Sequence, residues 1–206
     1  LFLLGRNEEA IKAFDRAIEL RPDYPQVWNN KGWALLRLGK FTEAVKSFDK
    51  VAQIIPDGEA AGIPRLAKIK YEALSNKGLA LVQLQNYQEA VKAFDKAISI
   101  KVDGFSLWIN KGLALQELNE HQEALDAFSK ATTLSGNVHE AWNYKGYVFE
   151  EIGKQQEALD AYDKAIQIKP DFVIAFNNKG LLQDTMGNHL EAIETYNKAL
   201  TIKPDL

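Results

Sequence analysis

The sequence contains no cysteine, which excludes a disulfide framework, a cysteine nucleophile and a thiolate metal site. Its six prolines and thirteen glycines are too few for a linker-like or collagenous chain. No apolar run approaches the roughly eighteen residues that a membrane-spanning helix needs. A net charge of -3 argues against sequence-independent binding to the phosphates of a nucleic acid. We therefore expect a cytoplasmic protein with neither a membrane nor a nucleic acid as its partner.

The sequence does contain enough apolar material for a folded core, because 46% of its residues are hydrophobic. It begins at Leu1, and no basic-then-apolar signal peptide is present. We expect a fragment or a processed product of a longer protein.

An internal repeat organises the whole chain. The dipeptide Lys-Gly recurs with its glycine at Gly78, Gly112, Gly146 and Gly180, which are spaced 34 residues apart. An earlier copy at Gly32 precedes Gly78 by 46 residues, which is one period and twelve inserted residues. A second signature, Glu-Ala followed by an aromatic residue four positions after the alanine, recurs in phase with the first. Its aromatic residues are Phe14, Phe48, Phe94, Phe128, Tyr162 and Tyr196.

Six copies of the second signature against five Lys-Gly pairs indicate that the chain starts inside a repeat. We expect the second half of a repeat over residues 1–24 and an insertion over 59–70. The five complete repeats are expected at 25–58, 71–104, 105–138, 139–172 and 173–206.

Each repeat has the pattern of two amphipathic helices. In repeat 139–172, Trp142, Gly146 and Phe149 recur at intervals of three and four residues, which is the stripe of one helix. Gly153 interrupts this pattern, and a second stripe follows it. That second stripe contains Ala158, Leu159, Tyr162, Ala165 and Ile166.

These residues resemble the tetratricopeptide repeat family, whose pattern has an aromatic residue at position four, glycine at eight, alanine at twenty, an aromatic residue at twenty-four, alanine at twenty-seven and proline at thirty-two. The fourth repeat supplies Trp142, Gly146, Ala158, Tyr162, Ala165 and Pro170 in that order. The resemblance covers nearly the whole chain. It implies an all-α fold, a right-handed superhelical α-solenoid of stacked antiparallel helix pairs.

A lysine stands at position seven of all five complete repeats, where the family usually has leucine. We expect its aliphatic stem to pack while its ammonium group reaches water or a carboxylate. Asp49, Asp95 and Asp163 are the candidate carboxylates. A ladder of ligand-binding lysines is the alternative.

The insertion at 59–70 allows two architectures. Pro64 suits the first turn of a helix, and no helix breaker separates it from Gly78, so the insertion is expected to lengthen the next helix. The alternative is a separate loop with Gly62 as its hinge. If the insertion lengthens the helix, its apolar residues Ile63, Leu66 and Ile69 either cover the preceding repeat or form an exposed docking patch.

No catalytic or metal-binding constellation is evident. The three histidines, His121, His139 and His189, form no His-Glu-x-x-His motif, and neither a phosphate-binding glycine loop nor a calcium loop is present. Glu150 and Glu151 are adjacent on a helix and point about 100° apart, so they do not form an acid–base pair. We expect no enzymatic activity, no cofactor and no metal.

The resemblance implies a peptide-binding groove on the concave face. In the family, positions two, five, six, nine, twelve and thirteen of each first helix line that face. Carried over position by position, the candidate groove residues are Asn29, Trp33, Arg37, Asn76, Leu79, Asn110, Gln116, Asn143, Tyr147, Glu150, Asn177, Leu181 and Asp184.

Two features of this groove set bear on its ligand. Asparagines recur at positions five and six, and their amides can either pair with an extended peptide or bridge neighbouring helices. Position nine is apolar or aromatic throughout and can bind apolar anchors, although part of it can be buried between helices. The set lacks the bases of a carboxylate clamp and is acidic in its second half, which favours a ligand with basic residues.

We therefore expect a scaffold that binds a peptide or a segment of a partner protein through basic or apolar anchors. The first alternative is a sensor or regulatory module of a larger signalling or effector enzyme. The second is head-to-tail self-association through ends that lack a polar cap.

Overall fold

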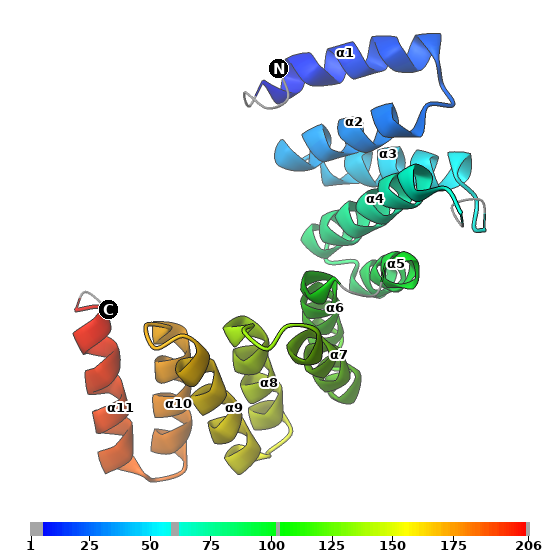
Figure 1. Cartoon of the computed structure of the whole chain (residues 1–206). Coiled ribbons are helices and arrows are strands. Elements are labelled where there is room, and N and C mark those ends of the chain that lie inside the picture. Colours follow the sequence, from blue (N-terminus) through cyan, green and yellow to red (C-terminus); the bar gives the residue numbers. More distant parts are fainter. Residues whose placement is uncertain (1–5, 59–61, 102–103, 205–206) are drawn as a thin grey trace. The chain divides into compact units, whose positions relative to one another are not determined.

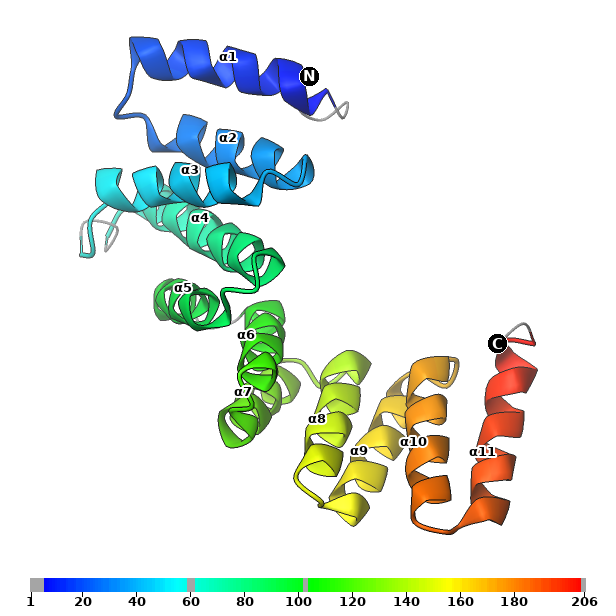
Figure 2. The same ribbon diagram turned by 180° about the vertical axis from the view of Figure 1, so that it is seen from behind.

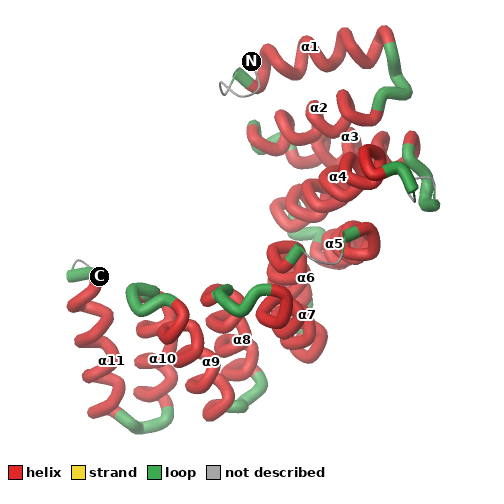
Figure 3. The backbone as a smooth tube through the Cα atoms, in the orientation of Figure 1, coloured by secondary structure: helices red, strands yellow, loops and turns green. Residues whose placement is uncertain are grey.

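The structure, a computed structural model, describes residues 6–58, 62–101 and 104–204. Within these ranges the chain forms eleven α-helices and no strand, which confirms the all-α prediction. It divides into two units, Leu1–Ala114 and Leu115–Leu206, with the division inside helix α6. Each unit consists of antiparallel helices joined by short loops (Figure 1, Figure 3).

The first unit contains five complete helices and most of a sixth. They are α1 (Asn7–Leu20), α2 (Pro25–Arg37), α3 (Phe41–Ile54), α4 (Pro64–Gln83), α5 (Tyr87–Ile100) and α6 (Phe105–Glu117), the last of which continues into the second unit. Helix α2 packs on α1 and α3, and α4 packs on α3 and α5 (Figure 2).

The second unit contains five further helices. They are α7 (His121–Leu134), α8 (His139–Glu151), α9 (Gln155–Ile168), α10 (Val173–Thr185) and α11 (His189–Ile202). Each of these helices packs on the next one along the chain, as the two opposite views of the second unit show (Figure 1, Figure 2).

An aromatic ring packed among alanines forms the core of four repeats. Phe48, Phe94, Phe128 and Tyr162, all from position twenty-four, are almost completely buried. The glycine at position eight allows the ring to approach the first helix in four repeats, where Gly32, Gly78, Gly146 and Gly180 face Phe48, Phe94, Tyr162 and Tyr196. A Cβ atom on Gly32 would lie 2.6 Å from the ring of Phe48, so no larger residue fits there without a shift.

The turn inside each repeat requires a left-handed residue. Gly153, between α8 and α9, has φ +76, a conformation that glycine adopts without a steric penalty. Gln85 and Asn119 occupy the equivalent place in two other repeats, with φ 58 and 59. These two turns therefore form without glycine.

Most of the insertion belongs to a helix. Helix α4 starts at Pro64 and continues to Gln83 without a break, so it is 20 residues long where α2 has 13. Ile69 is buried and Leu66 packs beside it on the core of the preceding repeat, where Val51 and Ile55 also lie. The lengthened helix thus covers that core, and residues 59–61 lie outside the described residues.

Candidate functional site

In the first unit, the groove set divides into structural and accessible residues. Asn29 is buried, and its Nδ2 donates a hydrogen bond of 3.3 Å to the carboxylate of Glu72 on α4. Since α2 and α4 belong to successive repeats, this amide bridges neighbouring helices.

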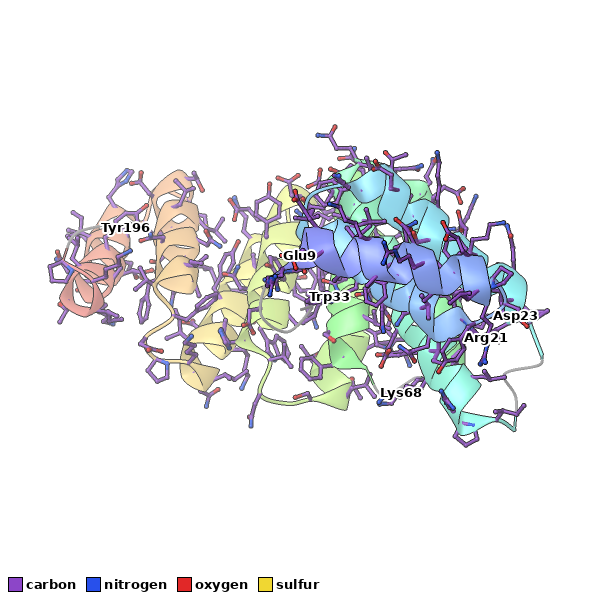
Figure 4. All side chains as sticks on the ribbon, turned by 90° about the horizontal axis from the view of Figure 1, so that it is seen from above. Glu9, Arg21, Asp23, Trp33, Lys68 and Tyr196 are labelled. Atoms are coloured by element: carbon purple, nitrogen blue, oxygen red, sulfur yellow. The ribbon has the colours of Figure 1, made fainter. Side chains whose placement is uncertain are left out.

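The accessible part of the first unit begins with Trp33 and Arg37 on α2. The Arg37 guanidinium lies 5.1 Å from the centroid of the Trp33 ring, a cation–π contact one turn of helix apart. Trp33 is half-buried, and Figure 4 shows it on its helix. Leu79 on α4 is exposed, while Asn76 and Asn110 are half-buried. Trp33 and Leu79 are therefore two position-nine side chains that the first unit presents, one aromatic and one aliphatic.

In the second unit, the asparagines of α8 and α10 contact each other. Asn178 donates a hydrogen bond of 3.0 Å from Nδ2 to Oδ1 of Asn143, which is itself almost fully buried. Asn177 is half-buried and lines a small cavity of about 260 Å³ with Tyr196 and Leu200 of α11. Of these three amides, Asn143 and Asn178 join the two helices, and Asn177 does not take part in that hydrogen bond.

Two apolar residues of the second unit point to solvent from position nine. Tyr147 on α8 is 40% exposed, and Leu181 on α10 is 54% exposed. Large apolar side chains are usually buried in the core of a folded protein. These two are accessible, so a partner can contact them.

Acidic residues surround Tyr147. The charge of Glu151 is the main cause of the raised pKa of Tyr147, and partial burial, a hydrogen bond to Glu151 and the charges of Glu150 and Glu117 act in the same direction. Three carboxylates therefore act on one exposed aromatic ring. Such a surface attracts a cation.

Other groove residues hold internal partners. The hydroxyl of Tyr162 donates a hydrogen bond of 3.0 Å to Glu150, and Asp184 lies 2.6 Å from Nδ1 of His189 at the start of α11. The side-chain oxygen of Gln116 is buried without a hydrogen-bond partner among the described residues. Glu150 and Asp184 thus contribute their charge to the surface while they also support the second helix of each pair.

Sequence reasoning missed an ion pair between the insertion and the end of the preceding repeat. Lys70 on α4 is only 3% exposed, and its Nζ lies 2.7 Å from Oδ1 of Asp57. The repeat pattern gives no expectation for Lys70, because this lysine occupies the last inserted position and has no counterpart in the other repeats. The signal was an unmatched lysine directly between Ile69 and Tyr71.

Four of the five position-seven lysines bind carboxylates of the preceding second helix. Lys77 contacts Asp49, Lys111 contacts Asp95 and Lys179 contacts Asp163 at 2.5, 2.5 and 2.6 Å. The three aspartates named from the sequence are therefore the observed partners. A fourth pair joins Lys31 to Asp15 of α1 at 2.5 Å.

No cluster of three or more His, Asp and Glu side chains that could hold a metal ion occurs in the described residues. Over the same part of the chain, every helix is too short or too polar to cross a bilayer.

Comparison with protein families identifies the repeat. Models described as tetratricopeptide repeat match residues 2–59, 71–102, 105–138, 139–172 and 173–206. The chain belongs to the tetratricopeptide repeat family. No curated protein matches it in sequence.

Solved structures of this family have similar folds. MamA is 25% identical, with a TM-score of 0.74, and the alignment covers 84% of this chain and 95% of MamA. YrrB, described as a TPR protein with an unusual peptide-binding site, is 26% identical with a TM-score of 0.72, and the alignment covers 95% and 94% of the two chains. MamA from Desulfovibrio magneticus RS-1 is 22% identical with a TM-score of 0.73, over 88% and 96%.

Proposed function

We propose that the chain is an interaction scaffold that binds a segment of a partner protein on the first helices of its repeats, with no catalysis of its own. The observation that carries this proposal is the exposure of Tyr147 and Leu181 at the same position of successive repeats. Their spacing of 34 residues makes them equivalent positions on α8 and α10. Apolar anchors of a ligand bind to such side chains.

The charge around these anchors favours a basic segment. Glu117, Glu150 and Glu151 act on Tyr147, and Asp184 lies one turn beyond Leu181 on α10. A ligand with arginine or lysine beside its apolar residues complements this surface. The attraction falls with salt because exposed charges are screened.

We assign the asparagines two different roles, contact between repeats and pairing with the ligand. Asn29 and Asn143 bind Glu72 and Asn178, so we assign them to the contacts between repeats. The half-buried amides of Asn76, Asn110 and Asn177 are the candidates for pairing with a ligand backbone. The peptide-binding site reported for YrrB supports peptide binding as a function of this fold.

Selection of peptides by display on the wild-type chain tests the proposal. We expect enrichment of peptides that alternate basic and apolar residues. The selected peptides should bind about tenfold more weakly to a Tyr147→Ser/Leu181→Ser variant, since truncation of an apolar anchor costs 1 kcal/mol or more. A Glu151→Lys variant should lose the preference for basic residues.

Leu134→Ser is the matched control, because Leu134 on α7 is as exposed as Tyr147 and lies outside the groove set. It should bind the selected peptides as the wild type does. Enrichment of acidic peptides, or an equal loss in the Leu134→Ser variant, would contradict a groove of this character.

A specific observation favours a second candidate function, association through the end of the second unit. Leu190, Ile193 and Leu200 of α11 are exposed, although Leu125, the counterpart of Ile193 on α7, is buried. A second copy of the chain would cover this face. Light scattering over a concentration series should show dimers or larger species that Ile193→Glu abolishes, and a monomer at every concentration would exclude the candidate.

A further inference from the structure

Ion pairs between position seven and the preceding second helix join most successive repeats. Four of the five position-seven lysines lie 2.5 to 2.6 Å from an aspartate at position twenty-five. The fifth lysine is Lys145 on α8. At position twenty-five of the preceding repeat the chain has Ser129 on α7, so the carboxylate is missing from this one step.

Lys145 has no carboxylate partner among the described residues. Its Nζ instead lies over the indole of Trp142, 4.5 Å from the ring centroid. In the paired repeats the equivalent distance is 5.5 Å, both for Lys31 over Trp28 and for Lys111 over Trp108. Among the residues that the structure describes, the electron-rich face of the indole therefore takes the place of the missing aspartate beside the ammonium group.

At Lys145, no ion pair within the described part of the chain offsets the free-energy cost of burying the ammonium group. Burial lowers the pKa of Lys145, because part of the hydration of the ammonium group is lost and no protein carboxylate replaces it. A charge that is desolvated and unpaired gains more from a new counter-charge than a fully hydrated surface lysine does.

The surroundings leave room for a ligand. Beside Trp142, an open cavity of about 660 Å³ reaches from α8 to α9. The residues that line it are Trp142, Phe149, Glu157, Asp160, Ala161, Asp163, Lys164 and Gln167. The cavity offers two aromatic side chains to an apolar group, while its carboxylates on α9 repel a ligand that carries several negative charges.

We propose that Lys145 and Trp142 bind a single carboxylate of a partner protein, an aspartate or glutamate side chain flanked by apolar residues. The ligand carboxylate takes the place that Asp163 and its equivalents fill beside the other lysines, on the side of α7. Its apolar neighbours contact Trp142 and Phe149. This surface lies outside the groove set, so it is a second binding site, distinct from the groove.

A pentapeptide, blocked at both ends, with one central aspartate between two leucines is the probe. We expect it to shift the side-chain NMR resonance of Lys145, which the Lys145→Gln variant assigns. A matched peptide with a central asparagine should leave that resonance unchanged. An unblocked peptide that ends in leucine and has only its terminal carboxylate distinguishes a C-terminus from an acidic side chain. A larger shift with this peptide would overturn the assignment to a side chain.

Two variants test the ion pairs directly, because one gives Lys145 an internal carboxylate and the other removes the carboxylate of Lys179. Ser129→Asp supplies the internal carboxylate while it keeps Lys145, so the aspartate peptide should bind about fivefold more weakly. Asp163→Ser removes the partner of Lys179 and should create a second responding lysine. These variants keep the test valid even if Lys145→Gln proves poorly folded. An unmoved Lys145 resonance, or equal affinity in the Ser129→Asp variant, would falsify the proposal.

Discussion

The ring of Tyr162 lies so close to the backbone of Gly146 that a Cβ atom on Gly146 would sit 2.5 Å from Cε1 of the ring. The same approach occurs between Gly180 and Tyr196 in the next repeat, where the corresponding distance is 2.6 Å. A glycine in the middle of a helix costs about 1 kcal/mol relative to alanine. The burial of a whole aromatic ring against the helix backbone offsets that cost.

Gly146→Ala should therefore destabilise the chain even though alanine favours helix formation. We expect a loss of about 1–3 kcal/mol in the free energy of unfolding, because the ring of Tyr162 is fully buried and cannot move aside. Urea denaturation measures it. Gly136→Ala is the control, since a Cβ atom there has no neighbour within 4 Å, and equal losses in the two variants would disprove the packing argument.

Tyr162→Phe should remove one hydrogen bond and leave the ring packing unchanged. The Tyr162 hydroxyl donates to Glu150, an acceptor that carries charge, so we expect a loss of about 1–2 kcal/mol near neutral pH. Urea denaturation of both proteins at pH 7 measures the difference. An unchanged midpoint would mean that water replaces the hydroxyl without cost.

The same hydroxyl should make stability depend on alkaline pH. Burial, and after it the charge of Glu150, raises the pKa of Tyr162 above its ordinary value of 10.0. The folded state then keeps a proton that the unfolded state releases, so this contribution is complete below pH 10 and is lost as the pH rises above it. Wild type should lose more stability than Tyr162→Phe between pH 9 and pH 11. Parallel losses in the two proteins would contradict this assignment.

Asp57→Asn should destabilise the first unit, and Lys70→Met should rescue it. The substitution leaves the buried Lys70 ammonium without its partner, but Asp57 is 78% exposed and solvent screens the pair. We expect a loss of about 1 kcal/mol, and a double variant close to wild type. The hydrogen bond from Lys70 is the main cause of the lowered pKa of Asp57, so the contribution is present above pH 4 and is lost as the pH falls through the folded-state pKa.

Ser129→Asp and Asp163→Ser should change stability in opposite directions. The first completes the ion pair that Lys145 lacks, and the second breaks the pair of Lys179 with Asp163. Each change should be below about 1 kcal/mol, because the aspartate of such a pair is about half exposed. Urea denaturation at low and high salt measures both, and the differences should shrink in high salt. A destabilising Ser129→Asp would show that α7 cannot present a carboxylate to Lys145.

The period of the sequence was enough to predict the helical fold and the residues of its core. Phe48, Phe94 and Tyr162 are buried as their shared position indicates, because in each of these repeats the ring packs against the same face of the first helix. The partners Asp49, Asp95 and Asp163 could also be named from their spacing.

The exposure of individual groove residues could not be read in this way. Asn29 and Asn143 carry the same amide at the same position, and their partners are Glu72 and Asn178, which stand at different positions of the following repeats. Whether an amide faces a ligand or a neighbouring helix depends on a side chain from another repeat. That side chain varies independently of the period.

The lengthened helix α4 has a consequence for how such a chain tolerates insertions. It exceeds α2 by seven residues, which is close to two full turns of an α-helix. An added heptad returns the helix to nearly the same angular phase, so Ile69 and Ala73 face the same core and Gly78 still meets Phe94. Insertions of whole heptads thus keep the two parts of the helix in register, whereas an insertion of five residues would turn the part after it by about 140° relative to the part before it.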